Sequence, residues 1–564
     1  MSRKEIKLMK INLIDGGNSI HADVFKKKIT KRIDVEFCDE GLSLEFSIDK
    51  TLDVAESYRI DKTEGGFSVK GSDCLGLYYG IGKLLHSAKW TKDSFYPIAT
   101  DGVISPACSY RAVYFSVHFY NWYQVSPIDE QESYLEDLLL WGYNVLHCTL
   151  PRVNCVDFKD PIFIKAAENV RRIFLMAKKF GMLVSLAVGS NQGVKSSPIE
   201  YSSDMGTMNL EYRGNLGRNL CVSNPDALEH LRSLWREEME CFTDIGLDFI
   251  TCWPYDEGGC GCEKCRPWGK VGYGNMVKAV NEELKKLFPK AKIVVSTWAF
   301  DVPSDEGEYE GFFKRLEGDL SFVDYVLTDA HKEFPRYPLE HKCPKPVVNF
   351  TEISMWGLAP WGGFGANPLP ERFQRIWDSS KHILSGGMPY TEGLYEDISK
   401  IQCIGYYWHP DRHYSEILSE YIAYEYGDDV IEDTLDLMRL IEINHTHIGN
   451  GEYPELHVAE KALDLALSIN KRLSDKAKRN WRWRILFIRA RLDVKRYGAL
   501  MADTSDDPKK LKRFMFFGGD YLLEDQEAQD MFYELWGYYH CLPHNGENHH
   551  TLPPYGGTKL DVVV

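Results

Sequence analysis

The 564-residue chain has 66 Lys and Arg against 83 Asp and Glu, which gives a formal net charge of −17. This balance excludes nucleic acid as an expected partner, because binding to a phosphate backbone depends on clustered cations. With 44% hydrophobic and 26% charged residues, the composition is that of a globular protein and excludes disordered, collagen-like and coiled-coil chains.

The segment at the start of the chain carries charges throughout and leads into no apolar core of signal-peptide length. No stretch approaches the roughly 18 apolar residues that a membrane span needs. Fourteen cysteines suit free thiols in a reducing compartment better than a disulfide framework. We therefore expect a cytoplasmic enzyme without membrane partners, and we leave open whether it forms a homo-oligomer.

Residues 1–105 combine short alternating segments with a helical pattern. The strand-like segments cover 34–37, 42–46, 57–60 and 66–69, and the helical pattern covers 74–87. These elements predict an N-terminal α+β domain. None of the glycines in this part belongs to a phosphate-cradling loop, so no nucleotide cofactor is expected.

Between residues 106 and 415, eight apolar runs of strand length alternate with amphipathic helical segments. The runs are 111–118, 144–150, 183–189, 249–255, 293–300, 323–330, 347–353 and 386–391. Eight strands that are buried on both faces and separated by helices predict an α/β fold, a (β/α)8 barrel. A doubly wound open sheet is the alternative. Residues 416–564 have helical periodicity and predict a C-terminal helical domain packed on the barrel.

Polar and aromatic side chains gather where the predicted barrel strands end, and this end of a barrel carries the chemistry. The candidates in chain order are His118, Asn191, Trp253, Tyr255, Asp256, Glu257, Trp298, Asp329, His331, Glu352, Trp356, Tyr390 and Glu392. Carboxylates beside Trp and Tyr on one rim can hold a sugar and deliver protons. An oligosaccharide or glycoside is therefore the expected substrate.

Four acids on this rim are the candidates for catalysis. Glycosidic cleavage needs one carboxylic acid that protonates the leaving oxygen and a second group that stabilises or captures the oxocarbenium-like centre. Asp256 and Glu257 follow strand four, whereas Glu352 and Glu392 follow strands seven and eight. They can face one another across a barrel mouth. A carbohydrate-binding barrel without catalysis is the alternative from another functional class.

A small α/β domain, the sequence Pro106-Ala-Cys-Ser-Tyr-Arg111 and the acid pair on strand four resemble glycoside hydrolases related to families 20 and 67. The resemblance to family 20, the β-N-acetylhexosaminidases, implies that Arg111 holds sugar hydroxyls and that Glu257 is the general acid/base. It implies that Asp256 orients the substrate's acetamido group, which attacks the anomeric carbon, so that a β-linked N-acetylhexosamine is cleaved with retention. Tyr390 is a candidate hydrogen-bond donor to that group.

Two further likenesses concern the same strand end. The resemblance to family 67, the α-glucuronidases, implies an inverting hydrolase in which Glu352 or Glu392 is the base, with Arg111 as a cationic contact for a uronate. The segment 256–265, with the preceding segment 220–225, is similar to barrels that include family 163, whose known activity is endo-β-N-acetylglucosaminidase. This local likeness favours an N-acetylglucosamine-type substrate.

Cys260, Cys262 and Cys265 form a Cys-x-Cys-x-x-Cys pattern with the tight spacing of a metal-binding turn. A structural zinc ion takes four ligands, for which Cys221 is the first candidate and Cys252 the alternative. Three free thiols in a glycine-rich turn would produce the same pattern. A structural zinc would stiffen the loop after the acid pair without touching substrate, and no cofactor is expected for catalysis itself.

Overall fold

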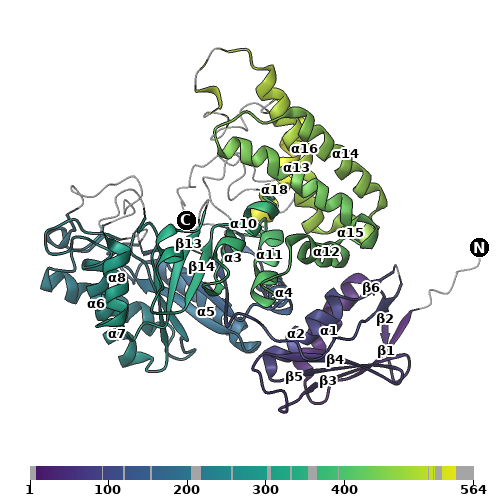
Figure 1. The fold of residues 1–564 in the computed structure, drawn as a ribbon, viewed down its shortest axis with the longest axis horizontal. Helices are drawn as coiled ribbons and strands as arrows, with labels where there is room; N and C mark the ends of the chain where they lie inside the picture. Colours follow the sequence, from purple (N-terminus) through teal and green to yellow (C-terminus); the bar gives the residue numbers. More distant parts are fainter. Residues whose placement is uncertain are drawn as a thin grey trace, which may run out of the picture.

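The computed structural model describes residues 8–540 apart from 92, 118–120, 153–154, 205–217, 256–257, 302–306, 331–332, 354–364, 392, 506, 508, 512–513, 515–521 and 523. Three parts follow one another along the chain: a sheet covered by helices, a barrel, and a group of helices. In Figure 1 the barrel lies at the left, the N-terminal sheet at the lower right and the last helices above.

The N-terminal part is a five-stranded sheet with two long helices. Its strand order is β2-β1-β3-β5-β4, in which only the β4–β5 pair is antiparallel. The elements are β1 (Met9–Ile14), α1 (Ser19–Arg32), β2 (Val35–Phe37), β3 (Leu42–Ile48), β4 (Tyr58–Thr63), β5 (Gly66–Gly71), α2 (Cys74–His86), β6 (Lys89–Trp90) and β7 (Phe95–Tyr96). The sequence pattern missed β1 and α1. Helix α1 buries the polar side chains of His21 and Lys28 among its apolar ones, which interrupts the helical periodicity.

Eight parallel strands form a closed barrel, because β15 pairs with β8 as well as with β14. The strands are β8 (Tyr110–Phe115), β9 (Val145–Thr149), β10 (Leu183–Gly189), β11 (Phe249–Cys252), β12 (Lys292–Ser296), β13 (Tyr325–Ala330), β14 (Val347–Thr351) and β15 (Leu384–Gly387), and β16 (Tyr390–Thr391) extends the last one along β8. Each of the eight apolar runs of the sequence overlaps one of these strands. The predicted (β/α)8 barrel is confirmed, and the open sheet is excluded.

Helices surround the barrel and connect its strands (Figure 1). They are α3 (Trp122–Val125), α4 (Ile128–Trp141), α5 (Pro161–Lys179), α6 (Pro225–Glu240), α7 (Gly272–Leu287), α8 (Glu308–Glu317), α9 (Arg336–Glu340), α10 (Pro370–Ser380) and α11 (Asp397–Trp408). Helices α5 and α6 start alike: Asp160 and Asn224 accept a hydrogen bond from the backbone N–H two residues on, and proline occupies the first helical position. The start of α6 also fixes the position of Cys221, a predicted metal ligand that lies three residues before Asn224.

Aromatic side chains fill the barrel interior. Near the start of the strands, the rings of Tyr110 and Phe249 meet edge to face, with their centroids 5.2 Å apart. Nearer the other end, Tyr114 contacts Tyr390 at 5.2 Å and Phe350 contacts Tyr390 at 5.7 Å between centroids. The barrel is thus a packed core rather than a channel, and a ligand can only meet it at its mouth.

The C-terminal part is helical, as the sequence predicted. Its helices are α12 (Tyr414–Glu425), α13 (Ile431–Gly449), α14 (Leu456–Arg472), α15 (Asp475–Arg479), α16 (Trp481–Ala502) and α18 (Gln526–His540). Helix α14 packs between α13 and α16. Among the helices that the structure describes, none combines the length and apolar character needed to cross a bilayer.

A buried ion network joins the three parts. Lys28 on α1 lies 2.6 Å from Asp137 on α4, and Arg482 on α16 lies 3.1 Å from the same carboxylate. Arg482 also lies 2.7 Å from Asp397 at the start of α11. Because the network takes groups from all three parts, it holds the N-terminal and C-terminal helices against the barrel helices α4 and α11.

Candidate active site

Two tryptophans at the carboxyl ends of the barrel strands remain partly exposed. Trp253 follows β11 and Trp298 follows β12, and their ring centroids are 6.5 Å apart. Trp253 also packs edge-on against Phe350 of β14, at 5.1 Å between centroids. The two indoles therefore form the accessible top of the aromatic barrel interior, which can stack on a flat ligand with an apolar face.

A carboxylate lies directly beside these rings. Glu352 comes one residue after β14, is only 3% exposed and pairs with Tyr390 through a backbone bridge. Trp298 Nε1 donates a hydrogen bond to Glu352 Oε1 at 3.4 Å. Burial lowers the pKa of Arg372, and the negative charge of Glu352 opposes that shift. An acid and an indole are thus in contact on the rim, and the acid also acts electrostatically on the Arg372 guanidinium.

Asp329 and Tyr390 also lie on this rim, as the sequence predicted, but deeper. Asp329 is the fifth residue of β13 and is aligned with Phe350 on β14. Its charge adds to burial in raising the pKa of Tyr309 well above the ordinary value. Both Asp329 and Tyr390 are buried, at 2% and 9% exposure. They form the floor of the mouth.

Six candidates lie outside the described residues. They are His118, Asp256, Glu257, His331, Trp356 and Glu392. For the acid pair and for Glu392, the residues on both sides are described. The contacts of those neighbours reveal how the chain is anchored at each place.

Asn191 clamps the backbone just after the acid pair. It is fully buried, and its Nδ2 donates to the carbonyl oxygens of Leu220 at 2.8 Å and Gly259 at 2.9 Å. Its Oδ1 accepts the Gly259 N–H at 2.8 Å. A Cβ on Gly258 would lie 2.6 Å from the Pro254 carbonyl oxygen and 2.8 Å from Asn191 Oδ1, so the turn requires glycine. The Asn191 side-chain amide therefore binds the backbone of this loop, and not the substrate as the sequence predicted.

A second clamp holds the chain around Glu392. The Tyr123 hydroxyl donates to the Gly393 carbonyl at 2.7 Å and hydrogen-bonds Thr391 Oγ1. Lys400 Nζ donates to the same Gly393 carbonyl at 2.6 Å and to the Tyr123 hydroxyl at 2.8 Å. Burial lowers the pKa of Lys400 to about 8. Sequence reasoning missed Tyr123 and Lys400, because 277 positions separate them and no local pattern relates them.

Arg111 lies at the wrong end of the barrel to hold sugar hydroxyls or a uronate. It is the second residue of β8, whereas the mouth is at the carboxyl ends of the strands. Its guanidinium is fully buried and donates to the Gly142 and Cys108 carbonyls, both at 2.8 Å. It also pairs with Glu56 of the N-terminal part and reaches Tyr79. We therefore correct the expected role: Arg111 joins the barrel to the N-terminal sheet.

Tyr255 also has a role that the sequence did not predict. Its side chain is fully buried, and its hydroxyl donates to the Glu308 carboxylate at the start of α8. Its ring packs edge-on against Phe300, with 6.3 Å between centroids. These contacts are with the helical layer outside the barrel. Tyr255 therefore supports the rim from behind, in place of the expected substrate contact.

The predicted cysteine group is assembled behind the same loop. The sulfur atoms of Cys221, Cys260, Cys262 and Cys265 all lie within 4.8 Å of one another. Cys252, the alternative fourth member, is buried on β11 with its sulfur packed against Gly189. Cys221, and not Cys252, is therefore the fourth cysteine of the group.

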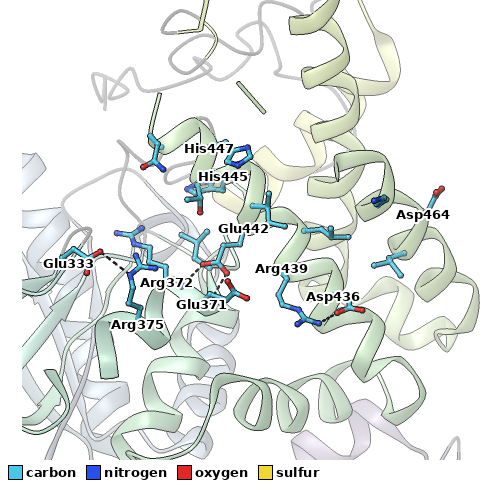
Figure 2. Close-up of a pocket in the computed structure, with 18 residues that line it drawn as sticks. Glu333, Glu371, Arg372, Arg375, Asp436, Arg439, Glu442, His445, His447 and Asp464 are labelled. Carbon is cyan, nitrogen blue, oxygen red and sulfur yellow. Dashed lines mark hydrogen bonds and ion pairs between the residues drawn. The ribbon is translucent and has the colours of Figure 1, made fainter. Parts of the chain in front are cut away.

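A cavity of about 1060 Å³ lies between α10, α13 and α14 (Figure 2). Arg372 and Arg375 line it from α10, and His445 lines it from α13. Both ring nitrogens of the buried His445 lack a hydrogen-bond partner among the described residues, and burial lowers its pKa well below the ordinary value. Arg372, on which the charge of Glu352 acts, is part of the cavity lining. The sequence did not reveal it, since its lining comes from separate parts of the chain.

One acid of this cavity makes stability depend on pH. Glu442 caps α10 by accepting the N–H groups of Glu371 at 2.9 Å and Arg372 at 2.8 Å, and burial raises its pKa from 4.5 to about 7. Between these values the folded chain keeps a proton that the unfolded chain has lost. We therefore expect this group to lower the free energy of unfolding as pH rises through that window, by up to about 3 kcal/mol.

Thermal unfolding at pH 5 to 8 checks this expectation. Glu442→Gln cannot ionise and should show a flatter pH profile than the unaltered chain. Glu432→Gln, an exposed acid on the same helix, is the matched control and should keep the original profile. An equally steep profile in Glu442→Gln would contradict the assignment.

Comparison with known proteins places the fold. The sequence matches no protein-family model and no curated protein. A family GH115 4-O-methyl-α-glucuronidase with specificity for decorated arabinogalactans is similar in structure, with a TM-score of 0.60 at 10% identity over 94% of this chain and 76% of that one. A family 89 glycoside hydrolase from Clostridium perfringens, in complex with its substrate GlcNAc-α-1,4-galactose, has a TM-score of 0.63 at 14% identity over 92% and 66%. The protein CpGH84B has a TM-score of 0.52 at 12% identity over 94% and 93%. The resemblance to glycoside hydrolases is thus confirmed at the level of the fold.

Proposed function

We propose that the protein is a glycoside hydrolase whose active site is the mouth of the barrel. The observation that carries the proposal is the rim itself, where the partly exposed Trp253 and Trp298 lie beside the buried Glu352. Gly259 and Gly393, which lie close in sequence to the acid pair and to Glu392, are anchored by side-chain hydrogen bonds. The similarity of the fold to glycoside hydrolases supports the same conclusion.

The substrate that we propose is an oligosaccharide or glycoside with a β-linked N-acetylhexosamine at the cleaved bond. Its recognition would use Trp253 and Trp298 as a platform for the sugar ring. The acid pair after strand four supports this class, and so does the family 89 structure, which binds an N-acetylglucosamine-containing substrate. The similar family 89 complex contains an α-linked sugar, so both anomers belong in the test.

The proposed reaction proceeds in two steps with retention. Glu257 protonates the glycosidic oxygen while the acetamido carbonyl oxygen, oriented by Asp256, forms a bond to the anomeric carbon and the leaving group departs. Glu257 then takes a proton from a water molecule whose oxygen forms a bond to the anomeric carbon. The bond between that carbon and the acetamido oxygen breaks, and the sugar is released with its original configuration. Asn191 positions the chain segment next to the acid pair, Lys400 positions the one next to Glu392, and neither side chain touches the substrate.

A second candidate is an inverting α-glucuronidase-like hydrolase with Glu352 or Glu392 as the base. The specific observation in its favour is the electrostatic interaction of Glu352 with Arg372, because a uronate carboxylate needs a cation and Arg372 would supply it in place of the distant Arg111. The fold similarity to the family GH115 4-O-methyl-α-glucuronidase also favours it.

A panel of nitrophenyl glycosides tests both candidates. It contains α- and β-GlcNAc, β-GalNAc, β-glucoside, β-galactoside and α-glucuronide. We expect release from the β-N-acetyl sugars, with retention in the first product detected by NMR. Release from the glucuronide alone with inversion would favour the second candidate. No release from the panel or from oligosaccharides, with binding on a glycan array, would overturn both in favour of a carbohydrate-binding barrel.

Removal of the Asn191 amide should lower turnover without weakening substrate binding. In Asn191→Ala the backbone groups of Gly259 and Leu220 lose their buried partners, so the loop after the acid pair loosens. We expect kcat to fall about 10- to 100-fold with little change in KM, because a small misplacement of a reacting group has effects of this size. Asn275→Ala, an exposed site on α7, is the control. A rise in KM with unchanged kcat would instead assign Asn191 to substrate binding.

A further inference from the structure

We propose that Cys221, Cys260, Cys262 and Cys265 bind one structural Zn²⁺ ion that ties together two loops at the barrel rim. The Sγ atoms of Cys221 and Cys262 are 3.7 Å apart, and those of Cys221 and Cys265 are 3.9 Å apart. A zinc ion with four sulfur ligands at about 2.3 Å separates neighbouring sulfurs by about 3.8 Å. Two of the six separations therefore match the edge length of the tetrahedron that zinc requires, and all four sulfurs lie within 4.8 Å of one another.

The same distances argue against a disulfide. Bonded sulfur atoms lie about 2.05 Å apart, far less than either separation. All four residues are free cysteines, with Cys260 and Cys265 fully buried and the other two partly exposed. Four sulfur ligands fill the coordination sphere and make a closed site, which is typical of structural and not of catalytic zinc.

The local backbone is shaped for a metal-binding turn. The N–H groups of Cys265 and Arg266 both donate to the Cys262 carbonyl, at 2.9 and 3.1 Å, which brings the second and third sulfurs of the pattern together. Ser223 Oγ lies 3.0 Å from Cys221 Sγ and 3.4 Å from Cys262 Sγ. A hydroxyl in this place can donate to thiolates and offset part of their charge, as neighbouring groups around metal ligands commonly do.

The ion would connect segments that are distant in sequence. Cys221 precedes α6, whereas the other three cysteines belong to the loop between β11 and α7, about 40 positions further on. Cys260 follows Glu257 by three residues, and Asn191 holds the intervening Gly259. Zinc would therefore fix the far side of the loop whose near side carries the acid pair, and this consequence rests on the proposed function.

The metal content of the purified full-length chain tests the site without any substrate. After dialysis in metal-free buffer, we expect one zinc ion per chain by mass spectrometry. Cys262→Ser alters a partly exposed ligand and should retain less than about a tenth of that amount. Cys241→Ser, a partly exposed free cysteine at the end of α6, is the matched control and should retain all of it.

Cobalt provides a second measurement that does not depend on a variant that folds. The unaltered chain, refilled with Co²⁺ after chelation, should show the visible absorption of tetrahedral thiolate coordination. Zinc loading should also slow hydrogen exchange across residues 258–266. A stoichiometric iron content, a refilled chain without that spectrum, or full zinc retention by Cys262→Ser would each overturn the proposal. A chain that binds zinc but cleaves no glycoside would uphold it and overturn the proposed function.

Discussion

Replacing Glu257 by glutamine should lower kcat/KM about 10²- to 10⁴-fold on a glycoside with a poor leaving group, which is the usual contribution of general acid catalysis. The amide keeps the size of the side chain but cannot give a proton to the glycosidic oxygen. For a nitrophenyl glycoside the first step needs little protonation, so the loss there should be smaller. The ratio between the two substrates, measured by steady-state kinetics, separates a lost proton donor from a general disturbance.

The pH dependence and a matched control make this test specific. The decline of activity at high pH, where the acid loses its proton, should disappear in Glu257→Gln. Glu263→Gln exchanges an exposed acid six positions further along the same loop and should leave both kinetic constants unchanged. Near-normal turnover of the poor substrate by Glu257→Gln would remove this residue from the role and would point to Glu352 or Glu392 as the proton donor.

Replacement of Arg482 by methionine should lower the free energy of unfolding by about 3–5 kcal/mol, as expected when one partner of a buried ion pair is removed. The Arg482 side chain is 9% exposed, and it lies 2.7 Å from Asp397, 3.1 Å from Asp137 and 3.7 Å from Glu425. Burial raises the pKa of Glu425, and the Arg482 charge opposes that shift. Methionine fills much of the space but leaves these carboxylates without their shared cation.

The loss should itself depend on pH. Without Arg482, the buried carboxylates can relieve their repulsion by taking up protons, so the deficit should be smaller at pH 5 than at pH 8. Chemical denaturation at both values measures it. Arg479→Met, an exposed site on the preceding helix α15, is the control. A deficit below about 1 kcal/mol at pH 8 would show that the network contributes no more than a surface ion pair.

The barrel could be predicted from the sequence because its signal is local. A strand of a parallel barrel is buried on both faces, so it reads as a short continuous apolar run, and β9 and β14 are buried at every residue. Helix α1 lacks such a signal, since His21 and Lys28 are buried together with its apolar residues. Their burial depends on partners elsewhere: Lys28 contacts Asp137 on α4. Local periodicity cannot register a partner more than 100 positions away.

The residues of the candidate site also fall into those that the local sequence placed correctly and those whose position depends on tertiary packing. Residues that directly follow a strand must lie on the rim, so Trp253, Trp298 and Glu352 were placed there from the sequence alone. Arg111 was misassigned because the resemblance to family 20 indicated the first barrel strand but not the end of the barrel at which the Arg111 side chain lies. Tyr255 was misassigned because the choice between the mouth and the helical layer depends on packing against α8.

The sequence by itself determined the eight strands, the rim positions of Trp253, Trp298 and Glu352, and the Cys-x-Cys-x-x-Cys turn. Only the tertiary structure decided that Cys221 and not Cys252 joins that turn, that Asn191 clamps the loop after the acid pair, and that Lys400 reaches Gly393 and Tyr123. The physical reason is that strand patterns and turns arise within a few neighbouring residues. Side-chain partners separated by 41, 68 or 277 positions come together only when the barrel closes.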